Sequence, residues 1–396
     1  MIKNRKISLS CFCLLISIFT ILDISQEAFQ KSAEAVNSDR LVPRFEVDPY
    51  WPQPLPNKWI MGRTIGIAID ERDHLFVVHR DQDSMFMSQE LGLDLGRAEC
   101  CTAAPPILEF DSAGNLISAW GGPGEGYTWP ESNHGIEVGA DGNVWIGGNG
   151  SGDSHVLVFT RDGQFVREIG LPGEPIDSLS TESFGRVAEI AIDRSTNEAY
   201  FADGYGNKRV AVVDVATGAF KRFWGAYGNE PIDERVVYDP DAPLPQQFVG
   251  PVHCAEPSND GLIYVCDRGA DRIQVFRPDG TFVKEGQVAP LTLAGTTWDI
   301  SFSHDENQEF IYVADGANFK VHILDRESLE VLAEFGDGGR QPGLFFGTHS
   351  IVTDTEGNIY TTETYEGKRA QKFLFQGLRP LGEHRTGAPW PDSELH

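Results

Sequence analysis

The stretch from Val252 to Gly280, VHCAEPSNDGLIYVCDRGADRIQVFRPDG, contains the pattern from which the fold is predicted. An apolar segment leads into the turn Asn259-Asp260-Gly261, and small and apolar residues then alternate up to Cys266. A further strand-like segment follows a charged turn, and Pro278-Asp279-Gly280 closes the unit. Alternation bounded by such turns is typical of antiparallel β-strands. The stretch therefore predicts one blade of a β-propeller.

The same pattern recurs six times along the chain, in units of roughly 35 to 65 residues. The units cover about 59–121, 130–170, 184–225, 252–286, 294–336 and 343–376. Helical periodicity is nearly absent, and the 42 glycines and 23 prolines suit a chain with many tight turns. We therefore expect an all-β fold, a six-bladed β-propeller. Two insertions interrupt the repeats, at 81–106 and 227–247, and insertions of this kind usually gather on a binding face.

The sixth unit contains only three strand-like segments, whereas RFEVDPYW at 44–51 is strand-like and belongs to no unit. An N-terminal strand that completes the last blade would close the ring and remove its open edge. We expect a signal peptide at 1–35, an N-terminal extension with the ring-closing strand at 36–58, the propeller at 59–378 and a C-terminal tail at 379–396.

The first residues have the pattern of an export signal. Basic residues at positions 3, 5 and 6 precede an apolar run at 7–22 that is short for a membrane span, and Ala33-Glu34-Ala35 offers a cleavage site. We expect export to the periplasm or the extracellular space; an uncleaved N-terminal anchor is the alternative. The net charge of −27 disfavours nucleic acid and anionic lipid. We expect a monomer with a small-molecule or peptide substrate, no nucleic-acid partner and no membrane span after signal cleavage.

Four cysteines lie outside the predicted signal peptide. Cys254 and Cys266 lie six residues on either side of Asp260, the middle of a predicted hairpin turn. They can therefore face each other across adjacent strands, and an exported protein permits a disulfide there. Cys100 and Cys101 are neighbours in the first insertion, and their spacing is compatible with a vicinal disulfide or with two free thiols.

Three histidines each precede a turn glycine by eight residues, in the second, fourth and sixth units. They are His134, His253 and His349, before Gly142, Gly261 and Gly357. Equivalent positions in alternate blades are about 120° apart around the channel, which the first strand of each blade lines. The three imidazoles should therefore converge on the axis as a three-nitrogen set of the kind that binds catalytic zinc. The alternative is that each is a hydrogen-bonded residue at a strand end.

The first, third and fifth units have no histidine at this position, where Ile65, a residue close to Glu189 and the region of Asp299 stand instead. The remaining histidines outside the signal peptide lack the symmetry, and we expect them at the surface or in turns. They are His74, His79, His155, His304, His322, His384 and His396.

Polar residues follow the second strands of several units, near the face on which the histidines lie. They include His79-Arg80, the run Asp203 to Asn207 with Tyr205 at its centre, and Asp267-Arg268. A tyrosine beside a cation can act as a general base, because the cation lowers its pKa. An arginine can hold a substrate carboxylate with two parallel hydrogen bonds. Taken singly, each of these residues is more often a solvated turn residue than a functional one.

At these residues the sequence resembles the peptidyl-α-hydroxyglycine α-amidating lyase family of NHL-type six-bladed propellers, over about residues 59–376. The matching motifs occur in the order of the family. They are His79-Arg80, Asn133-His134-Gly135, Asp203 to Arg209, Val252-His253-Cys254, Cys266 to Gln274 and Thr348-His349-Ser350.

The resemblance implies a zinc ion held by His134, His253 and His349. It also implies Tyr205 as the catalytic base or a hydroxyl close to the metal. Arg80 and Arg268 would bind the substrate carboxylate and stabilise developing charge. The implied reaction cleaves the C–N bond of a carbinolamide and gives an amide and glyoxylate, or a related aldehyde.

Two departures from the family pattern concern the third histidine. The family's aspartate after it, which helps to hold a structural Ca²⁺, is Ser350 here, and this weakens the case for calcium. The methionine that often stands two residues before it is Gly347. Two other functions stay open: a metal-dependent hydrolase of esters or lactones that uses the same site, and a non-enzymatic propeller that binds peptide, glycan or protein.

Overall fold

The computed structural model describes residues 40–81 and 99–380. The predicted signal peptide, residues 82–98 of the first insertion and residues 381–396 of the predicted tail lie outside the described residues. The chain divides into two compact units, one of Met1–Arg44 with Gly377–His384 and one of Phe45–Gln376 with Arg385–His396. Of the first unit only 40–44 and 377–380 are described. The propeller apart from residues 41–44 and 377–380, with every residue of the site described below, lies within Phe45–Gln376.

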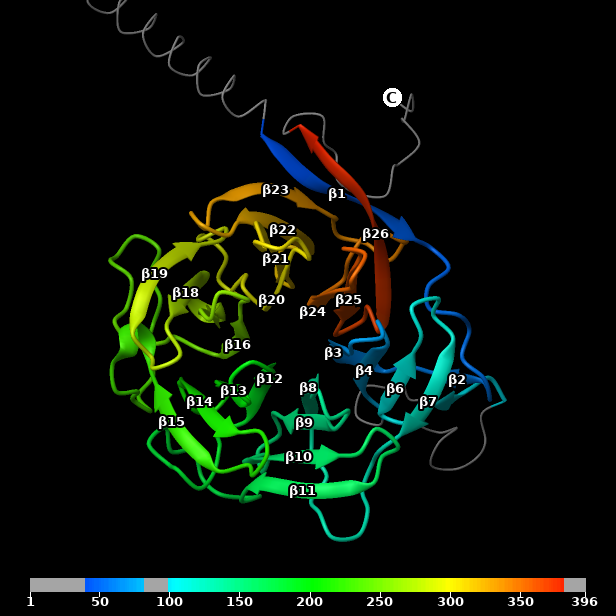
Figure 1. Ribbon diagram of the computed structural model, residues 1–396, viewed down its shortest axis with the longest axis horizontal. Coiled ribbons are helices and arrows are strands. Elements are labelled where there is room, and N and C mark those ends of the chain that lie inside the picture. The colour runs from blue at the N-terminus through cyan, green and yellow to red at the C-terminus, as the bar shows by residue number, and fades with distance from the viewer. Residues whose placement is uncertain (1–39, 82–98, 381–396) are drawn as a thin grey trace, which may run out of the picture. The chain divides into compact units, whose positions relative to one another are not determined.

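Six four-stranded antiparallel sheets are arranged around a central channel (Figure 1), and the predicted six-bladed propeller is confirmed. Blade one contains β3 (Arg63–Ile69), β4 (Leu75–Arg80), β6 (Ile107–Phe110) and β7 (Leu116–Trp120). Blade two contains β8 (Asn133–Val138), β9 (Val144–Gly148), β10 (His155–Phe159) and β11 (Phe165–Gly170). Blade three contains β12 (Val187–Asp193), β13 (Glu198–Asp203), β14 (Arg209–Asp214) and β15 (Phe220–Trp224).

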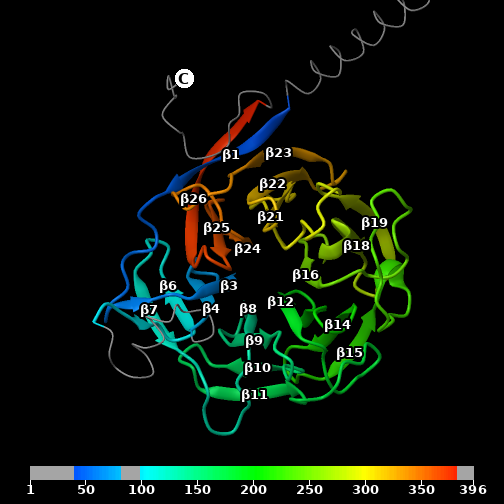
Figure 2. The same cartoon turned by 180° about the vertical axis from the view of Figure 1, so that it is seen from behind.

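The second half of the ring repeats this plan. Blade four contains β16 (Val252–Pro257), β17 (Ile263–Asp267), β18 (Arg272–Phe276) and β19 (Phe282–Gln287). Blade five contains β20 (Asp299–Phe302), β21 (Phe310–Asp315), β22 (Lys320–Asp325) and β23 (Val331–Phe335). Blade six contains β24 (Thr348–Thr353), β25 (Ile359–Glu363) and β26 (Arg369–Pro380), with β1 (Leu41–Asp48) as its outer strand. Seen from behind, the six innermost strands again surround the channel (Figure 2).

The strand β1 closes the ring, as predicted for the orphaned N-terminal segment, although it spans Leu41–Asp48 and not 44–51. Its residue Phe45 is buried and packs against Phe335 of blade five and Phe375 of blade six, at centroid distances of 5.5 and 5.9 Å. A strand from the start of the chain therefore completes the sheet formed by its end, so that blade six has no unpaired outer edge at β26.

The hydrophobic core lies between neighbouring blades. Middle strands such as β10 and β18 are buried along their whole length, because both faces of each sheet are covered, whereas outer strands such as β11 have exposed residues. One cluster joins blades three and four and includes Tyr200, Phe248 and Val265. The arrangement leaves the inner ends of the first strands to form the channel wall, where polar side chains can gather.

Two disulfides lie in the described residues. Cys254 of β16 pairs in register with Cys266 of β17 and is bonded to it, which confirms the predicted pairing. Cys100 and Cys101 are bonded to each other, so that of the two alternatives the structure has the vicinal disulfide. They directly precede β5 (Thr102–Ala103), which pairs with β2 (Trp59–Ile60) beside blade one.

Short 3-10 turns supply the only helical elements among residues 40–81 and 99–380, η1 (Ala226–Gly228) and η2 (Arg268–Ala270). No helix in this described part is long and apolar enough to cross a membrane.

Candidate metal centre

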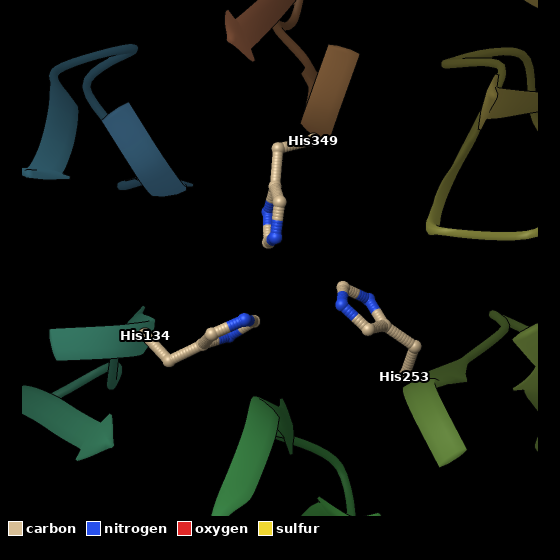
Figure 3. A group of neighbouring side chains, drawn as sticks. All are labelled: His134, His253 and His349. Carbon is tan, nitrogen blue, oxygen red and sulfur yellow. The ribbon is translucent and has the colours of Figure 1, made fainter. Parts of the chain in front are cut away.

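His134, His253 and His349 converge on the channel axis from blades two, four and six (Figure 3). Their ring centroids are 4.8 to 5.2 Å apart. One ring nitrogen from each histidine lies within 4.8 Å of the others, and all three side chains are buried. The structure thus brings together the three residues that the eight-residue spacing selected, in an arrangement that suits a single metal ion.

A β-bulge places each of these imidazoles. The pairing of the first strand with the second shifts between Asn133 and Ile136, between Val252 and Cys254, and between Thr348 and Ile351. A bulge redirects a side chain that would otherwise point to one face of the sheet, and here the redirected side chain is the histidine. The turn glycine eight residues later has a positive φ in each blade, 78°, 80° and 83°, which a side-chain-bearing residue rarely adopts.

The blades without a histidine supply the partners that orient the three rings. Nδ1 of His134 lies 2.6 Å from the carbonyl oxygen of Ala188 in blade three, and Nδ1 of His253 donates to the carbonyl of Trp298 next to blade five. His349 has the carbonyl of Ile65 in blade one as its backbone partner. A proton held on Nδ1 leaves the lone pair on Nε2, the form in which a histidine binds a metal.

Burial keeps all three imidazoles neutral. It lowers the pKa of His349 to about 3, and it lowers the pKa of His134 and His253 well below the usual value. Electrostatic repulsion between adjacent imidazoles also lowers the pKa of His134 and His253, because protonation of either would compete with that of His349. The charge of Arg268 adds to the effect on His253 and His349. Neutral imidazole is the ligand form for zinc and other transition metals, so the donor set fits such an ion without a prior loss of protons.

Tyr205 lies between two of the histidines. Its hydroxyl oxygen is 3.0 Å from Nε2 of His134 and 3.0 Å from Nε2 of His253. It follows β13 in a turn that packs tightly on blade four: a Cβ added at Gly204 would lie 2.0 Å from the carbonyl oxygen of Val252. The glycine before Tyr205 therefore lets this turn approach the strand that carries His253.

Arg268 contacts the hydroxyl of Tyr205, with Nη1 at 3.3 Å. Its guanidinium carbon lies 3.9 Å from the centroid of the Trp298 ring, a cation–π arrangement that holds the side chain over the site. Burial raises the pKa of Tyr205, while the positive charges of Arg268 and Arg80 act to lower it. Of the two arginines that the sequence singled out, Arg268 thus contacts the phenol and Arg80 acts on it through its charge.

Arg80 lies at the end of β4, in the blade across the channel from blade four (Figure 1). Its Nε donates to the carbonyl oxygen of Asn133 at 3.2 Å, and its Nη2 donates to Oδ1 of Asn149 at 2.7 Å. Because Asn133 directly precedes His134, this arginine is fixed next to the metal centre from the side opposite to Arg268.

Buried acid–arginine pairs hold the loops that carry these residues. Asp203 accepts from Arg209 at 2.8 Å just before Tyr205, and Asp267 accepts from Arg272 at 2.9 Å just before Arg268; all four side chains are fully buried. Each aspartate also accepts backbone N–H bonds from the loop before the first strand of its blade, at Gly185 and at Gly250. The motif residues Asp203 and Arg209 therefore position the loop rather than line the site.

A second polar group occupies the channel beside the triad, around a cavity of about 30 Å³ that His253 and Ser350 also line. It consists of Glu137, Glu189, Glu256 and Asp299. Burial raises the pKa of Glu137 to about 8 and that of Asp299 to about 6, and it raises those of Glu189 and Glu256 well above the usual value. The carboxyl groups of Glu189 and Asp299 are hydrogen-bonded to each other, which requires a shared proton.

The grouping of Glu189, Cys254 and Asp299 offers too few ligands for calcium. The sulfur of Cys254 is bonded to Cys266, and Asp299 already accepts the backbone N–H groups of Ile300 and Ile351. A Ca²⁺ site takes six to eight oxygen ligands. The donor chemistry of the described channel residues thus favours a transition metal at the triad over calcium beside it.

Two aromatic residues of the site escaped sequence analysis. Trp298 contacts both His253 and His349, at centroid distances of 5.9 and 5.4 Å, and Tyr365 contacts Trp298 at 6.1 Å. Tyr365 follows the second strand of blade six, as Tyr205 does in blade three, so the same positional rule could have found it. Trp298 stands at the histidine position of blade five, whose first turn, at 305–308, has no glycine on which to align.

The expectation that the other histidines lie at the surface or in turns is wrong for three of them. His79, His155 and His322 are buried. His79 binds the first insertion through the carbonyl of Pro105 at 3.0 Å, and His155 binds the carbonyl of Thr128 at 2.6 Å. His322 pairs with Asp315 at 2.9 Å. These three act as structural hydrogen-bonding residues.

Comparison with known proteins gives relatives of low identity. The chain matches no described protein family profile. It is 25% identical over 298 residues to NHL repeat-containing protein 3 of Mus musculus, and this alignment covers 73% of this chain and 70% of that protein. It is 24% identical over 351 residues to peptidyl-glycine alpha-amidating monooxygenase of Mus musculus, and this alignment covers 82% of this chain and 32% of that protein.

These matches bear out the resemblance to NHL-type propellers and to amidating enzymes at the level of sequence similarity. The chain spans about a third of the amidating monooxygenase that it matches. Among solved structures, a protein of unknown function from Bacteroides thetaiotaomicron aligns with a TM-score of 0.51 at 16% identity, over 85% of this chain and 77% of that one. That likeness supports the fold alone.

Proposed function

We propose that this protein is an exported, zinc-dependent lyase that cleaves the C–N bond of an N-acyl-α-hydroxyglycine, giving an amide and glyoxylate. The observation that carries the proposal is the position of the Tyr205 hydroxyl, 3.0 Å from Nε2 of both His134 and His253 and 3.3 Å from the Arg268 guanidinium. The similarity to peptidyl-glycine alpha-amidating monooxygenase, over 82% of this chain, supports a role in the α-amidation of a peptidyl-glycine type of substrate.

The triad would hold the metal through Nε2 of His134, His253 and His349. Three imidazoles leave a further coordination position open, as in catalytic zinc sites. A Zn²⁺ ion there supplies Lewis acidity toward the hydroxyl oxygen of the substrate. The rings of His134 and His253 need no rearrangement to present Nε2, because their Nδ1 atoms are directed to backbone carbonyls of the following blades. Nδ1 of His349 lies 3.3 Å from the hydroxyl oxygen of Ser350.

Arg268 binds the carboxylate of the substrate in this proposal. It lies beside Tyr205 and is held by Trp298, and a guanidinium matches a carboxylate with two parallel hydrogen bonds. This contact would place the carbinol carbon next to the hydroxyl of Tyr205. Arg80, fixed on the other side of the triad, supplies positive charge near the departing amide.

Tyr205 moves the proton. Its oxygen, in the ionised form, takes the proton of the carbinol hydroxyl while the C–O bond becomes a C=O bond. The C–N bond breaks and its electron pair passes to the amide nitrogen, which then takes the proton from Tyr205. Substrate atoms and charges balance without water, an oxidant or a reductant. Burial raises the pKa of Tyr205, and the positive charges of Arg268 and Arg80 act against this rise and favour the phenolate that this role requires.

Export is part of the proposal. The segment 1–35 has the features of a secretory signal, and the described chain contains two disulfides, which form and persist mainly in oxidising compartments.

The function is tested by incubating zinc-loaded protein with an N-acyl-α-hydroxyglycine and measuring the amide and glyoxylate. The proposal predicts equal amounts of both products, above the spontaneous rate and abolished by a zinc chelator. Hydrolysis of esters or lactones without glyoxylate release would instead support the hydrolase alternative. Failure to bind any metal would favour the non-enzymatic binding protein.

A further inference from the structure

A pocket of about 230 Å³ lies beside the metal centre, between blades one and two. Its walls are the segment 129–133, the pair Gly122-Pro123 and the pair Arg80-Asp81 at the end of β4. It is distinct from the axial channel, since none of the three candidate metal ligands lines it.

Two residues of the pocket wall link it to the site. Asn133 directly precedes His134, and its carbonyl oxygen accepts from Nε of Arg80 at 3.2 Å. The side chain of Asn133 donates in turn to the carbonyl of His79 at 3.1 Å. A group that occupied this pocket would therefore lie one residue away from a metal ligand, on the side of the channel opposite to Arg268.

The wall at 129–133 is held in place without any ligand. The carboxylate of Asp153 accepts the backbone N–H groups of Glu131 at 2.7 Å, Ser132 at 3.1 Å and Gly150 at 2.6 Å. Trp129 packs against Phe159 at a centroid distance of 5.8 Å and against Tyr127 at 6.3 Å. Ligand sites are usually formed in advance in this way.

Size and chemistry indicate what the pocket binds. Its volume is below the roughly 300 Å³ at which pockets for drug-sized ligands begin, so it accommodates a single side chain. Trp129, Pro123 and Pro130 provide apolar surface, and the guanidinium of Arg80 favours the face of an aromatic ring. The carboxylate of Glu131, at the exposed edge, is engaged by Ser151 and Gly152 and disfavours an anionic group.

We propose that this pocket binds the side chain of the residue that precedes the α-hydroxyglycine, and that it prefers an aromatic side chain over a small or acidic one. This rests on the lyase function proposed above. The substrate is linear, with its carboxylate and its acyl group on opposite sides of the scissile C–N bond. Arg268 belongs to blade four, whereas Arg80 and Asp81 of the pocket wall belong to blade one. Figure 1 shows these two blades on opposite sides of the channel, which suits the two ends of the substrate.

The test compares kcat/KM for glyoxylate release from three substrates, in which N-acetyl-phenylalanine, N-acetyl-glycine or N-acetyl-aspartate precedes the α-hydroxyglycine. The wild-type protein should prefer phenylalanine over glycine by about tenfold or more, because an apolar pocket gains from each buried carbon, and aspartate should be the poorest. Trp129→Ala should bring the phenylalanine-to-glycine ratio to within about twofold.

Ser132→Phe provides a second, independent variant. It fills the pocket from a half-buried position and keeps the backbone N–H that Asp153 accepts, so it should also abolish the preference even if Trp129→Ala fails to fold. Ile117→Ala is the matched control. Ile117 is half-exposed on the outer strand of blade one and does not line the pocket, so the ratio should stay at the wild-type value.

The outcomes separate the subsite from the reaction. Equal kcat/KM for the phenylalanine and glycine substrates in the wild-type protein, or a wild-type ratio in Ser132→Phe, would overturn the subsite and leave the lyase function intact. No glyoxylate from any substrate would overturn the lyase function. In that case calorimetric titration with N-acetyl-phenylalanyl-glycine and N-acetyl-glycyl-glycine tests the pocket alone, and equal Kd values for the two would refute it.

Discussion

The hydroxyl oxygen of Tyr205 lies 3.0 Å from Nε2 of His253, the nitrogen that would bind the proposed metal. A phenol from blade three and an imidazole from blade four thus meet at the channel axis. This contact places the proposed proton-transferring group next to the proposed Lewis acid.

Tyr205→Phe should lower kcat for glyoxylate release by about 10²- to 10⁴-fold, the usual contribution of a general base. Zinc content should stay at the wild-type level, since the three histidines are unchanged. Tyr50→Phe, at an exposed position, is the control and should behave as wild type. A Tyr205→Phe protein that keeps more than half of the wild-type kcat would remove Tyr205 from the chemistry.

Arg268→Lys should raise KM for a substrate with a free carboxylate by about tenfold or more. Lysine keeps the charge but loses the two parallel hydrogen bonds and the stacking on Trp298. The methyl ester of the same substrate should be a poor substrate for the wild-type protein and should respond little to the change. Arg277→Lys, in an exposed turn of the same blade, is the matched control. Equal KM effects on acid and ester would show that Arg268 does not bind the carboxylate.

The fold could be predicted from the sequence because its evidence is local. Within Val252 to Gly280, blade four contains alternating strand segments that are separated and closed by turn residues. The sixth unit contains only three strand-like segments, so the segment at 44–51 has a place there as the fourth strand. The pairing of Cys254 with Cys266 follows from the same hairpin register. Buried histidines such as His79 and His155 were missed because their partners, Pro105 and Thr128, lie in loops whose paths no repeat specifies.

The histidine triad could be predicted because a turn glycine fixes the register of each of its blades. Trp298 could not be predicted in this way, because blade five has no such glycine at 305–308. Without it, counting from the turn does not identify which residue of blade five stands at the histidine position. The carbonyl partners of the rings are backbone groups that belong to any residue type, so the sequence holds no signal for them. Of the channel carboxyl groups, the sequence singled out Glu189 and Asp299 only as residues near the histidine position of the third and fifth units. Glu137 and Glu256 gave no signal, because a charged residue that alternates with apolar ones in a strand is typical of an exposed face.

The wild-type protein should lose stability as the pH rises from about 5 to about 8, and Glu137→Gln should make this loss smaller. The pKa of Glu137 is raised to about 8 in the folded protein, mainly by burial and also by the charge of Asp299, while Arg194 acts in the opposite direction. In the unfolded chain the pKa of a glutamate is about 4.3. Because the folded protein holds the proton more tightly, the raised pKa contributes stability that is fully present below about pH 4.3 and is lost as the pH rises through 8. Urea midpoints measured at pH 5 and pH 8 test this. A wild-type pH dependence in the variant would show that Glu137 ionises freely.

Replacement of Cys254 and Cys266 by alanine should lower the free energy of unfolding by about 2 to 4 kcal/mol, because the disulfide closes a hairpin with a sequence separation of 12 residues. Replacement of Cys100 and Cys101 by alanine is the control. That bond joins neighbours and closes no chain loop, so its removal should cost less than about 1 kcal/mol. Urea unfolding of both double variants gives the comparison, and equal losses would contradict the account.

The metal content of the purified protein tests the central claim most directly. Elemental analysis after zinc loading and removal of free metal should give about one zinc per chain for the wild type and for His304→Ala, whose histidine is exposed in a turn. His253→Ala should retain less than a tenth of that amount while its far-ultraviolet circular dichroism stays unchanged. A folded wild-type protein without bound metal, or a His253→Ala protein with a full complement of zinc, would contradict the proposed metal centre.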